Sequence, residues 1–133
     1  MKVVIDTNVF ISGIFWTGSP NKVITAWKAG KFQTIVSIDI VNEISRVLSD
    51  FEIALPPEQI SEWTDLIMKN SIIVEPQDKV MIVKEDPADN KFVDAAVSGK
   101  AELIVTGDAH LKKLKEYQGV KIISPDEFLQ MLK

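Results

Sequence analysis

The sequence predicts one α/β domain over residues 1–133, a three-layer α/β/α sandwich around a mostly parallel central sheet. Short apolar runs alternate along the chain with longer segments whose apolar residues recur at helical spacing, and few residues separate them. The chain is near the commonest size of a single domain and shows no repeat, low-complexity stretch or linker. These observations indicate parallel strands joined by helical crossovers.

The first strand is predicted to pass directly into a helix. Residues 3–5 form a β-branched run that ends at Asp6, and the apolar residues after it recur at helical spacing. Ser19 and Pro20 predict a second helix, with the serine as N-cap and the proline at the first helical position. Gly30 follows the last apolar residues of that helix, where glycine commonly ends a helix.

The middle of the chain repeats the pattern of strand and helix. Residues 32–36 predict a second buried strand, and apolar residues recur at helical spacing over residues 38–51. Two prolines at positions 56 and 57 predict the start of another helix. Residues 72–74 predict a strand that ends before Pro76.

The next helix is predicted to begin at Asp86 and Pro87 and to end before Gly99. Residues 103–106 are apolar almost throughout, which is typical of a strand buried on both faces. A short helix from Ala109 follows.

A strand and a capped helix are predicted to end the chain. Residues 120–123 form the strand, and the helix begins at Ser124 with Glu127 three residues later, the pattern of a capping box. In open sheets of this kind, ligands bind at the carboxyl edge of the strands.

Composition excludes several kinds of chemistry. The absence of cysteine excludes disulfides, thiolate zinc sites and cysteine nucleophiles. His110 is the single histidine, which excludes multi-histidine metal sites and disfavours a serine-type triad. A net charge of -4 argues against tight, non-specific coating of nucleic acid. No apolar run approaches the ~20 residues of a membrane span and no secretory signal opens the chain, so we expect a cytoplasmic protein without membrane association.

Four acidic residues are predicted to meet at the carboxyl edge of the sheet. Asp6 is the first residue past the first strand, and Asp108 lies two residues past Thr106. Because parallel strands end at the same edge, these two carboxylates converge. Glu43 and Asp89 lie in the opening turns of helices that are predicted to start at that edge.

The helical phase distinguishes the candidates for the third acid. Asp89 shares a face with the apolar residues three, four and seven positions later, so it is predicted to point toward the protein. Asp94 is turned about 140° from Asp89, at ~100° per residue, and is predicted to lie on a more solvated face. Asp86 is equally well explained as a helix N-cap. Asp86 and Asp94 stay open as alternatives to Asp89.

Clustered carboxylates indicate a cation. Carboxylates within several ångströms repel one another and raise one another's pKa values unless a cation lies between them. A site of oxygen ligands alone suits a hard ion, Mg²⁺ or Mn²⁺. Such an ion bridges the protein and a phosphate and lowers the pKa of a bound water. The acids therefore point to hydrolysis of a phosphodiester.

Four segments, in this order and spacing, resemble the motifs of the PIN domain family, and most closely those of the PIN-domain ribonucleases of toxin–antitoxin pairs. They are Ile5-Asp6-Thr7-Asn8-Val9, Asn42-Glu43-Ile44-Ser45-Arg46-Val47-Leu48, Asp86-Pro87-Ala88-Asp89-Asn90-Lys91-Phe92 and Leu103-Ile104-Val105-Thr106-Gly107-Asp108. The resemblance covers the whole chain and implies a Rossmann-like PIN fold.

The resemblance also implies a function. It implies Mg²⁺- or Mn²⁺-dependent cleavage of single-stranded RNA, a small antitoxin protein as partner, and a homodimer. The residues at the acidic positions of the family are Asp6, Glu43, Asp89 and Asp108. Of these, Asp6, Asp89 and Asp108 are expected to bind the metal.

Other polar and aromatic residues are candidates for supporting roles. Asn8 and Thr106 are expected to position the acids or waters by hydrogen bonds, although Asn8 is almost as well explained as a helix cap. His110 is either a proton carrier or an ordinary surface histidine. Candidate phosphate contacts are Lys22, Lys91, Lys112, Lys113 and Lys115, all of which are also explained as solvated lysines. The tryptophans, which either stack bases or belong to the core or a dimer interface, are Trp16, Trp27 and Trp63.

Two other functions compete with the nuclease. A non-catalytic PIN-like module for RNA binding or assembly would gain nothing from clustered acids. A phosphatase with Asp6 as covalent nucleophile, of the haloacid-dehalogenase type, would need a second Asp where this chain has Asn8. Both features favour the nuclease.

Overall fold

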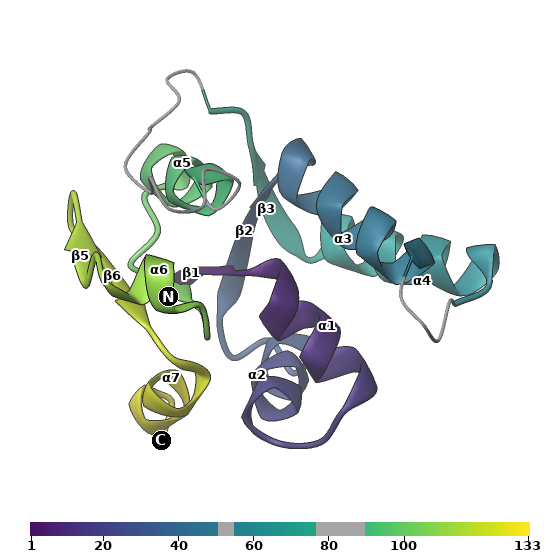
Figure 1. The fold of residues 1–133 in the computed structure, drawn as a ribbon, viewed down its shortest axis with the longest axis horizontal. Coiled ribbons are helices and arrows are strands. Elements are labelled where there is room, and N and C mark those ends of the chain that lie inside the picture. Colours follow the sequence, from purple (N-terminus) through teal and green to yellow (C-terminus); the bar gives the residue numbers. More distant parts are fainter. Residues whose placement is uncertain (51–54, 77–89) are drawn as a thin grey trace.

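The computed structural model describes residues 1–50, 55–76 and 90–133, and it places their strands in one six-stranded sheet (Figure 1). The strand order is β3-β2-β1-β4-β6-β5. Neighbouring strands run parallel except β5 and β6, which are antiparallel. The strands are β1 (Lys2–Ile5), β2 (Gln33–Ser37), β3 (Ser71–Val74), β4 (Leu103–Val105), β5 (Glu116–Tyr117) and β6 (Val120–Ile123).

Helices flank the sheet. α5 packs on the four strands β1 to β4, whereas α3 packs on β2 and α4 packs on β3. Figure 1 shows α5 on one side of β2 and β3, and α3 with α4 on the other. The predicted α/β architecture with a mostly parallel sheet is confirmed. The helices are α1 (Thr7–Phe15), α2 (Ser19–Lys28), α3 (Ile38–Asp50), α4 (Pro57–Lys69), α5 (Asn90–Gly99), α6 (Ala109–Lys112) and α7 (Pro125–Met131).

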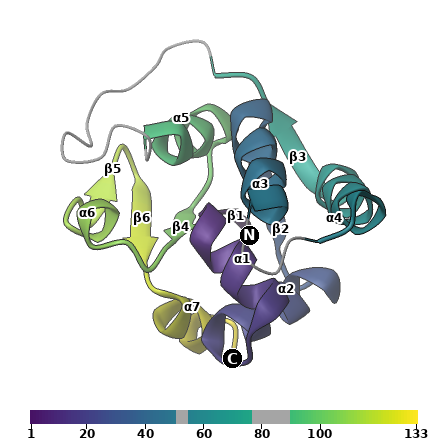
Figure 2. The same cartoon turned by 45° about the vertical axis from the view of Figure 1, so that its right-hand side comes forward.

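A third group of helices consists of α1, α2 and α7. α2 packs against both α1 and α7, and α2 and α7 lie side by side in both views of the ribbon (Figure 2). The carboxyl end of the chain lies beside them. Among the described helices, none combines the length and apolar character needed to cross a membrane.

The core forms on the central strands because their residues are apolar on both faces. Each residue from Val3 to Ile5 and from Leu103 to Val105 is at most 2% exposed. Helices cover both faces of these strands, which explains why the sequence shows continuous apolar runs rather than an alternating pattern. The core therefore fixes the ends of β1 and β4, where Asp6 and Asp108 follow.

The structure adds one strand that the sequence pattern does not predict. β5 has two residues and pairs antiparallel with β6 through the intervening Gln118 and Gly119. Both of these residues have positive φ, 49° and 84°, as a tight hairpin turn of this kind requires. Two residues are too few to show strand periodicity, so only the turn could have signalled the hairpin.

The start of α2 also differs from its prediction. Ser19 is already helical, and Gly18, with φ of 123°, occupies the N-cap position without a side-chain hydrogen bond. The Ser19 hydroxyl donates instead to the Asp126 carboxylate on α7. Gly30, with φ of 77°, follows the helix as predicted. The serine that marks the start of α2 thus ties α2 to α7.

Candidate active site

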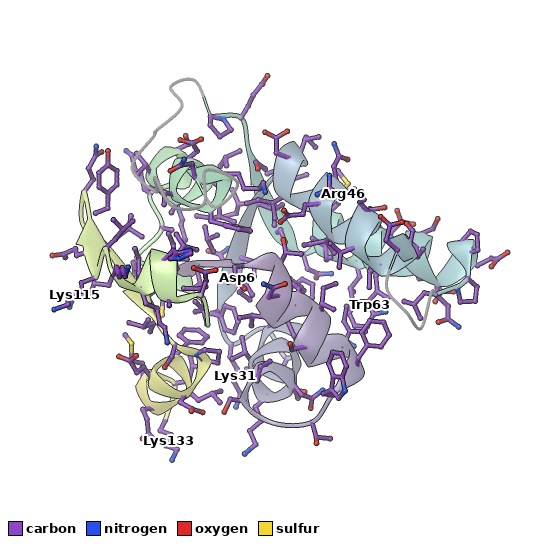
Figure 3. The ribbon with its side chains drawn as sticks, in the orientation of Figure 1. Asp6, Lys31, Arg46, Trp63, Lys115 and Lys133 are labelled. Atoms are coloured by element: carbon purple, nitrogen blue, oxygen red, sulfur yellow. The ribbon has the colours of Figure 1, made fainter. Side chains whose placement is uncertain are left out.

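Asp6 lies at the junction of β1 and α1, near the centre of the molecule (Figure 3). It is the N-cap of α1, and its Oδ1 accepts a hydrogen bond of 2.8 Å from the Val9 N–H. Its Oδ2 accepts a hydrogen bond from the Thr106 hydroxyl. Only 3% of Asp6 is exposed. Both carboxylate oxygens are therefore held in place by neighbouring groups.

Asp108 lies at the same edge of the sheet, because β4 pairs parallel with β1 and Val105 lies opposite Ile5. It is the N-cap of α6, and its Oδ1 accepts hydrogen bonds from the N–H groups of His110, at 2.7 Å, and Leu111, at 3.1 Å. Its own N–H donates to the Thr106 Oγ1 at 2.9 Å. The hydroxyl of the fully buried Thr106 therefore connects the Asp6 carboxylate with the Asp108 backbone.

Glu43 joins this edge from α3, as predicted, and is held by two other helices. Its Oε2 accepts a hydrogen bond from the hydroxyl of Thr7, the first residue of α1. Its Oε1 lies 2.7 Å from the Nζ of Lys91 on α5, and both of these side chains are about four-fifths buried. Arg46 contributes a longer contact of 3.9 Å to the same oxygen. Glu43 thus lies where α1, α3 and α5 meet.

The electrostatics at Asp6 disfavour its charged form. The pKa of Asp6 is raised from 3.8 to about 6, chiefly by burial and to a smaller extent by the nearby carboxylates of Asp108 and Glu43. The hydrogen bonds from Thr106 and Val9 act in the opposite direction. Desolvation of the carboxylate outweighs these hydrogen bonds. A cation beside Asp6 would offset both burial and repulsion.

Of the three candidates for the third acid, the structure describes only Asp94. Asp86 and Asp89 lie outside the described residues. Asp94, predicted on a solvated face, is in fact buried, with 8% exposed, so that prediction is wrong. The reason is the close packing of α5 on the sheet: a Cβ at Gly99 would lie 2.7 Å from the Ile35 Cδ1, and residues 92–96 are all buried. A larger part of the circumference of α5 is therefore buried than in a typical amphipathic helix at a protein surface.

Asn8 lies beside the acids without bonding to them. It is exposed on α1, and its side chain makes no hydrogen bond within the described part of the chain. Asp6, and not Asn8, caps α1. His110 lies 3.9 Å from the Asp108 Oδ1 and is 43% exposed, close enough for an ion pair when protonated.

The tryptophans occupy different environments, away from the acids. Trp27 is buried in the core and packs edge-to-face on Phe10, with ring centroids 5.5 Å apart. Trp63 lies under the ammonium group of Lys28, 4.5 Å from the ring centroid. Trp16 is half exposed. The structure therefore places Trp27 in the core, which is one of the two roles the sequence allows.

Sequence reasoning missed two contacts of the site, those of Thr7 and Lys91 with Glu43. Thr7 follows Asp6 in the first motif, but no spacing rule relates it to a residue 36 positions away. Lys91 was one of five candidate phosphate contacts, and only tertiary structure shows that it faces an acid.

The donor set fits a hard divalent cation. Every candidate ligand is a carboxylate oxygen, the ligand type that Mg²⁺ and Mn²⁺ prefer. The buried carboxylate of Asp6, whose pKa is raised, is close enough to the carboxylates of Asp108 and Glu43 to be repelled by both. Within residues 1–50, 55–76 and 90–133, no three acidic or histidine side chains form a metal-binding group. The third ligand predicted from the sequence, Asp89, lies outside those ranges.

Comparison with known proteins agrees with the fold and the motifs. An uncharacterized protein of Methanocaldococcus jannaschii is 29% identical over 147 residues, which cover 98% of this chain and 90% of that protein. The crystal structure of VapBC2 from Rickettsia felis, bound to a DNA fragment from their promoter, is similar with a TM-score of 0.61 and 16% identity, and the match covers 93% of this chain and 98% of that one. FitAcB from Neisseria gonorrhoeae is similar with a TM-score of 0.54 and 15% identity, and the match covers 92% and 97%. The model of the PIN domain family matches residues 2–110, so the chain belongs to the PIN domain family.

Proposed function

We propose that this protein is a metal-dependent endoribonuclease that hydrolyses phosphodiester bonds of single-stranded RNA. One observation carries the proposal: burial at the end of β1, and to a smaller extent the two carboxylates beside it, raises the pKa of Asp6 to about 6. Such a cluster destabilises the folded protein, and the simplest explanation for it is that the acids bind a cation. Membership of the PIN domain family supports a nuclease.

The acids divide into two groups by their proposed roles. Asp6, Asp108 and Asp89 would hold Mg²⁺ or Mn²⁺, which when bound polarises the phosphodiester and lowers the pKa of a water. Thr106 would help to position the two acids, because its hydroxyl donates to the Asp6 carboxylate and accepts from the Asp108 N–H. Glu43 accepts a hydrogen bond from Thr7 and pairs with Lys91, so it brings an ammonium group to the edge of the cluster.

The non-catalytic alternative gains no support from these contacts. A module that only binds RNA would be more stable without a buried, ionised Asp6, since a carboxylate with a pKa near 6 is costly to keep charged at neutral pH. An RNA-binding surface is also generally basic, whereas the described cluster is acidic.

We further propose that the protein is a cytoplasmic toxin, held inactive by a small antitoxin protein, and a homodimer. The motifs resemble those of PIN-domain toxins, and the fold is shared with VapBC2 and FitAcB. The proposal is supported by coverage of nearly the whole length of both structures.

Cleavage of defined RNA oligonucleotides tests the function directly. The purified protein is expected to cut single-stranded RNA with Mg²⁺ or Mn²⁺ and to lose all activity in excess EDTA, because the water is activated by the cation. Double-stranded RNA of the same sequence is the control for strand preference. Undiminished cleavage in EDTA would exclude the metal mechanism.

Lys91 is expected to contact the substrate phosphate, because its ammonium group is already fixed at the edge of the acids. A Lys91→Met variant is expected to raise the KM for RNA about 5- to 10-fold, by loss of one charge-assisted hydrogen bond. The slope of log K for RNA binding against log salt concentration should fall by about one, the value for one lost phosphate contact. Steady-state kinetics at several salt concentrations measure both.

The matched control is Lys69→Met, which removes an exposed lysine of α4 that is not among the candidate phosphate contacts. Titration with Mn²⁺ gives a second readout: Lys91→Met is expected to bind the ion more tightly than wild type, because Glu43 loses its counter-charge. An unchanged KM and salt dependence would assign Lys91 a structural role only.

A further inference from the structure

A cavity of about 460 Å³ lies directly beside Asp108, and neither Glu43 nor Lys91 is among the residues that line it. Three residues of α1 line it together with two prolines, one near the start of α2 and one at the start of α7, and with the segment around Asp108. The lining residues are Asn8, Val9, Ser12, Pro20, Gly107, Asp108, Ala109 and Pro125. Asn8 and Ser12 are four residues apart, so they lie on one face of α1. The cavity therefore opens onto one of the acids that we propose to act in cleavage.

The walls of the cavity are fixed by close packing. At Gly13 a Cβ would lie 2.4 Å from the Ile24 Cγ1 and 2.8 Å from the Pro20 carbonyl oxygen, so only glycine allows α1 and α2 to approach this closely. The Asn21 Nδ2 donates to the Gly13 carbonyl at 2.9 Å. These contacts hold Pro20, which lines the cavity, against α1.

The opposite wall is held in a similar way. Pro125 lines the cavity at the start of α7, and the neighbouring Asp126 accepts a hydrogen bond from the Ser19 hydroxyl, beside Pro20. Ser124 and Glu127 form the capping box that fixes the start of α7. The two prolines thus occupy fixed positions before any ligand binds, as in most small-molecule sites.

The lining favours an uncharged, flat group with polar edges. Among the described residues that line the cavity none is lysine or arginine, and Asp108 contributes a carboxylate, so a phosphate is disfavoured inside it. Proline rings offer apolar surface to a planar ring. The Asn8 side chain carries both a donor and an acceptor, which is the pattern that pairs with the edge of a nucleobase.

We propose that this cavity is a nucleoside-binding subsite, which receives the base and sugar of a nucleotide next to the cleaved phosphodiester. The inference rests on the proposed nuclease function, and it adds Asn8 and Ser12 as residues that determine which nucleotide is preferred there. The phosphate stays outside, at the acids, while the base lies against Asn8 and the two prolines. A volume of about 460 Å³ is within the range of small-molecule sites.

Binding of the four ribonucleoside 5′-monophosphates, followed by NMR of the isotope-labelled protein in Mg²⁺, tests the subsite. Wild type is expected to show shift changes at Asn8, Ser12 and Gly107. Ser12→Leu, which fills the cavity from the half-buried face of α1, is expected to weaken binding of all four at least about 10-fold. Thermal melting verifies that the variant is folded.

The matched control is Thr25→Val, which alters an exposed residue of α2 that lines a different cavity, between α2 and α7. It is expected to bind as wild type. Wild-type affinity in Ser12→Leu, or shift changes confined to the region of Thr25, would overturn the subsite. Asn8→Ala is the second variant: it is expected to reduce the differences in affinity among the four nucleotides, and unchanged differences would exclude base contact by Asn8.

Cleavage patterns separate the failure of the subsite from the failure of the proposed function. If RNA is cut and Ser12→Leu cuts at the same positions with the same KM, the subsite is wrong and the nuclease stands. If no RNA is cut but mononucleotides bind in the cavity and Ser12→Leu abolishes that binding, the nuclease fails and the nucleoside subsite stands.

Discussion

An Asp6→Asn variant is expected to lose RNA cleavage at least about 100-fold and, in EDTA at pH 8, to unfold at a higher temperature than wild type. The loss follows because the change removes charge from the proposed metal site. The gain follows because Asp6 is 3% exposed and burial raises its pKa to about 6. Activity and stability should therefore move in opposite directions.

The direction of the pH dependence follows from this shift. A carboxyl group with a folded pKa near 6 and an unfolded pKa near 3.8 binds its proton more tightly when the protein is folded. Its destabilising effect is fully present above about pH 6, diminishes as the pH falls, and is gone below about pH 4. At full strength it amounts to about 3 kcal/mol, at 1.36 kcal/mol per pKa unit.

Asparagine keeps much of the local structure while it removes the charge. Its carbonyl oxygen can still accept the hydrogen bond from Val9 and cap α1, since Asn and Asp are about equally good N-caps. We expect the melting temperature to rise by about 5 °C or more in EDTA at pH 8, and the gain to vanish near pH 4. Calorimetry over this pH range measures both.

Asp108→Asn is the matched control, because the side chain of Asp108 is 26% exposed and solvent reduces its cost of burial. It is expected to lose cleavage as Asp6→Asn does, with little gain in stability. Millimolar Mn²⁺ is expected to raise the melting temperature of wild type and much less that of either variant. If Asp6→Asn melts at or below wild type in EDTA, the carboxylates are not crowded.

The parts of the fold that the sequence predicts are those set by local periodicity and by capping. The runs ending at Ile5 and Val105 are continuously apolar, and the parallel arrangement then brings Asp6 and Asp108 together without further information. The capping box of Ser124 is local in the same way. These features depend on residues a few positions apart, which a single sequence displays.

The rest depends on contacts between distant segments. Ser19 donates to a residue 107 positions later, and Lys91 pairs with Glu43 across 48 positions. The burial of Asp94 has the same origin, because helical phase describes one face of α5 whereas the sheet and α3 together surround more than one. A single sequence carries no signal for such pairings.

The other large effect is expected from substitution of the third acid. The residues that share the predicted face of Asp89 are Phe92, Val93 and Ala96, and the structure buries all three. α5 packs on strands β1 to β4, so a buried residue on that face lies within the protein and not toward solvent. We therefore expect Asp89→Asn to abolish cleavage and to weaken Mn²⁺ binding at least about 10-fold.

The burial of Asp94 makes it the decisive comparison. At 8% exposed it already interacts with neighbouring groups, so Asp94→Asn is expected to lower the stability by about 1–3 kcal/mol and to change Mn²⁺ affinity less than 3-fold. Asp86→Asn should have the smallest effect, since asparagine caps a helix as well as aspartate. Calorimetric titration of Mn²⁺ into each variant, paired with RNA cleavage at saturating Mn²⁺, distinguishes the three. Loss of Mn²⁺ binding in Asp94→Asn, with binding retained in Asp89→Asn, would move the third ligand to Asp94 and show that the inward face of α5 extends around the helix to that residue.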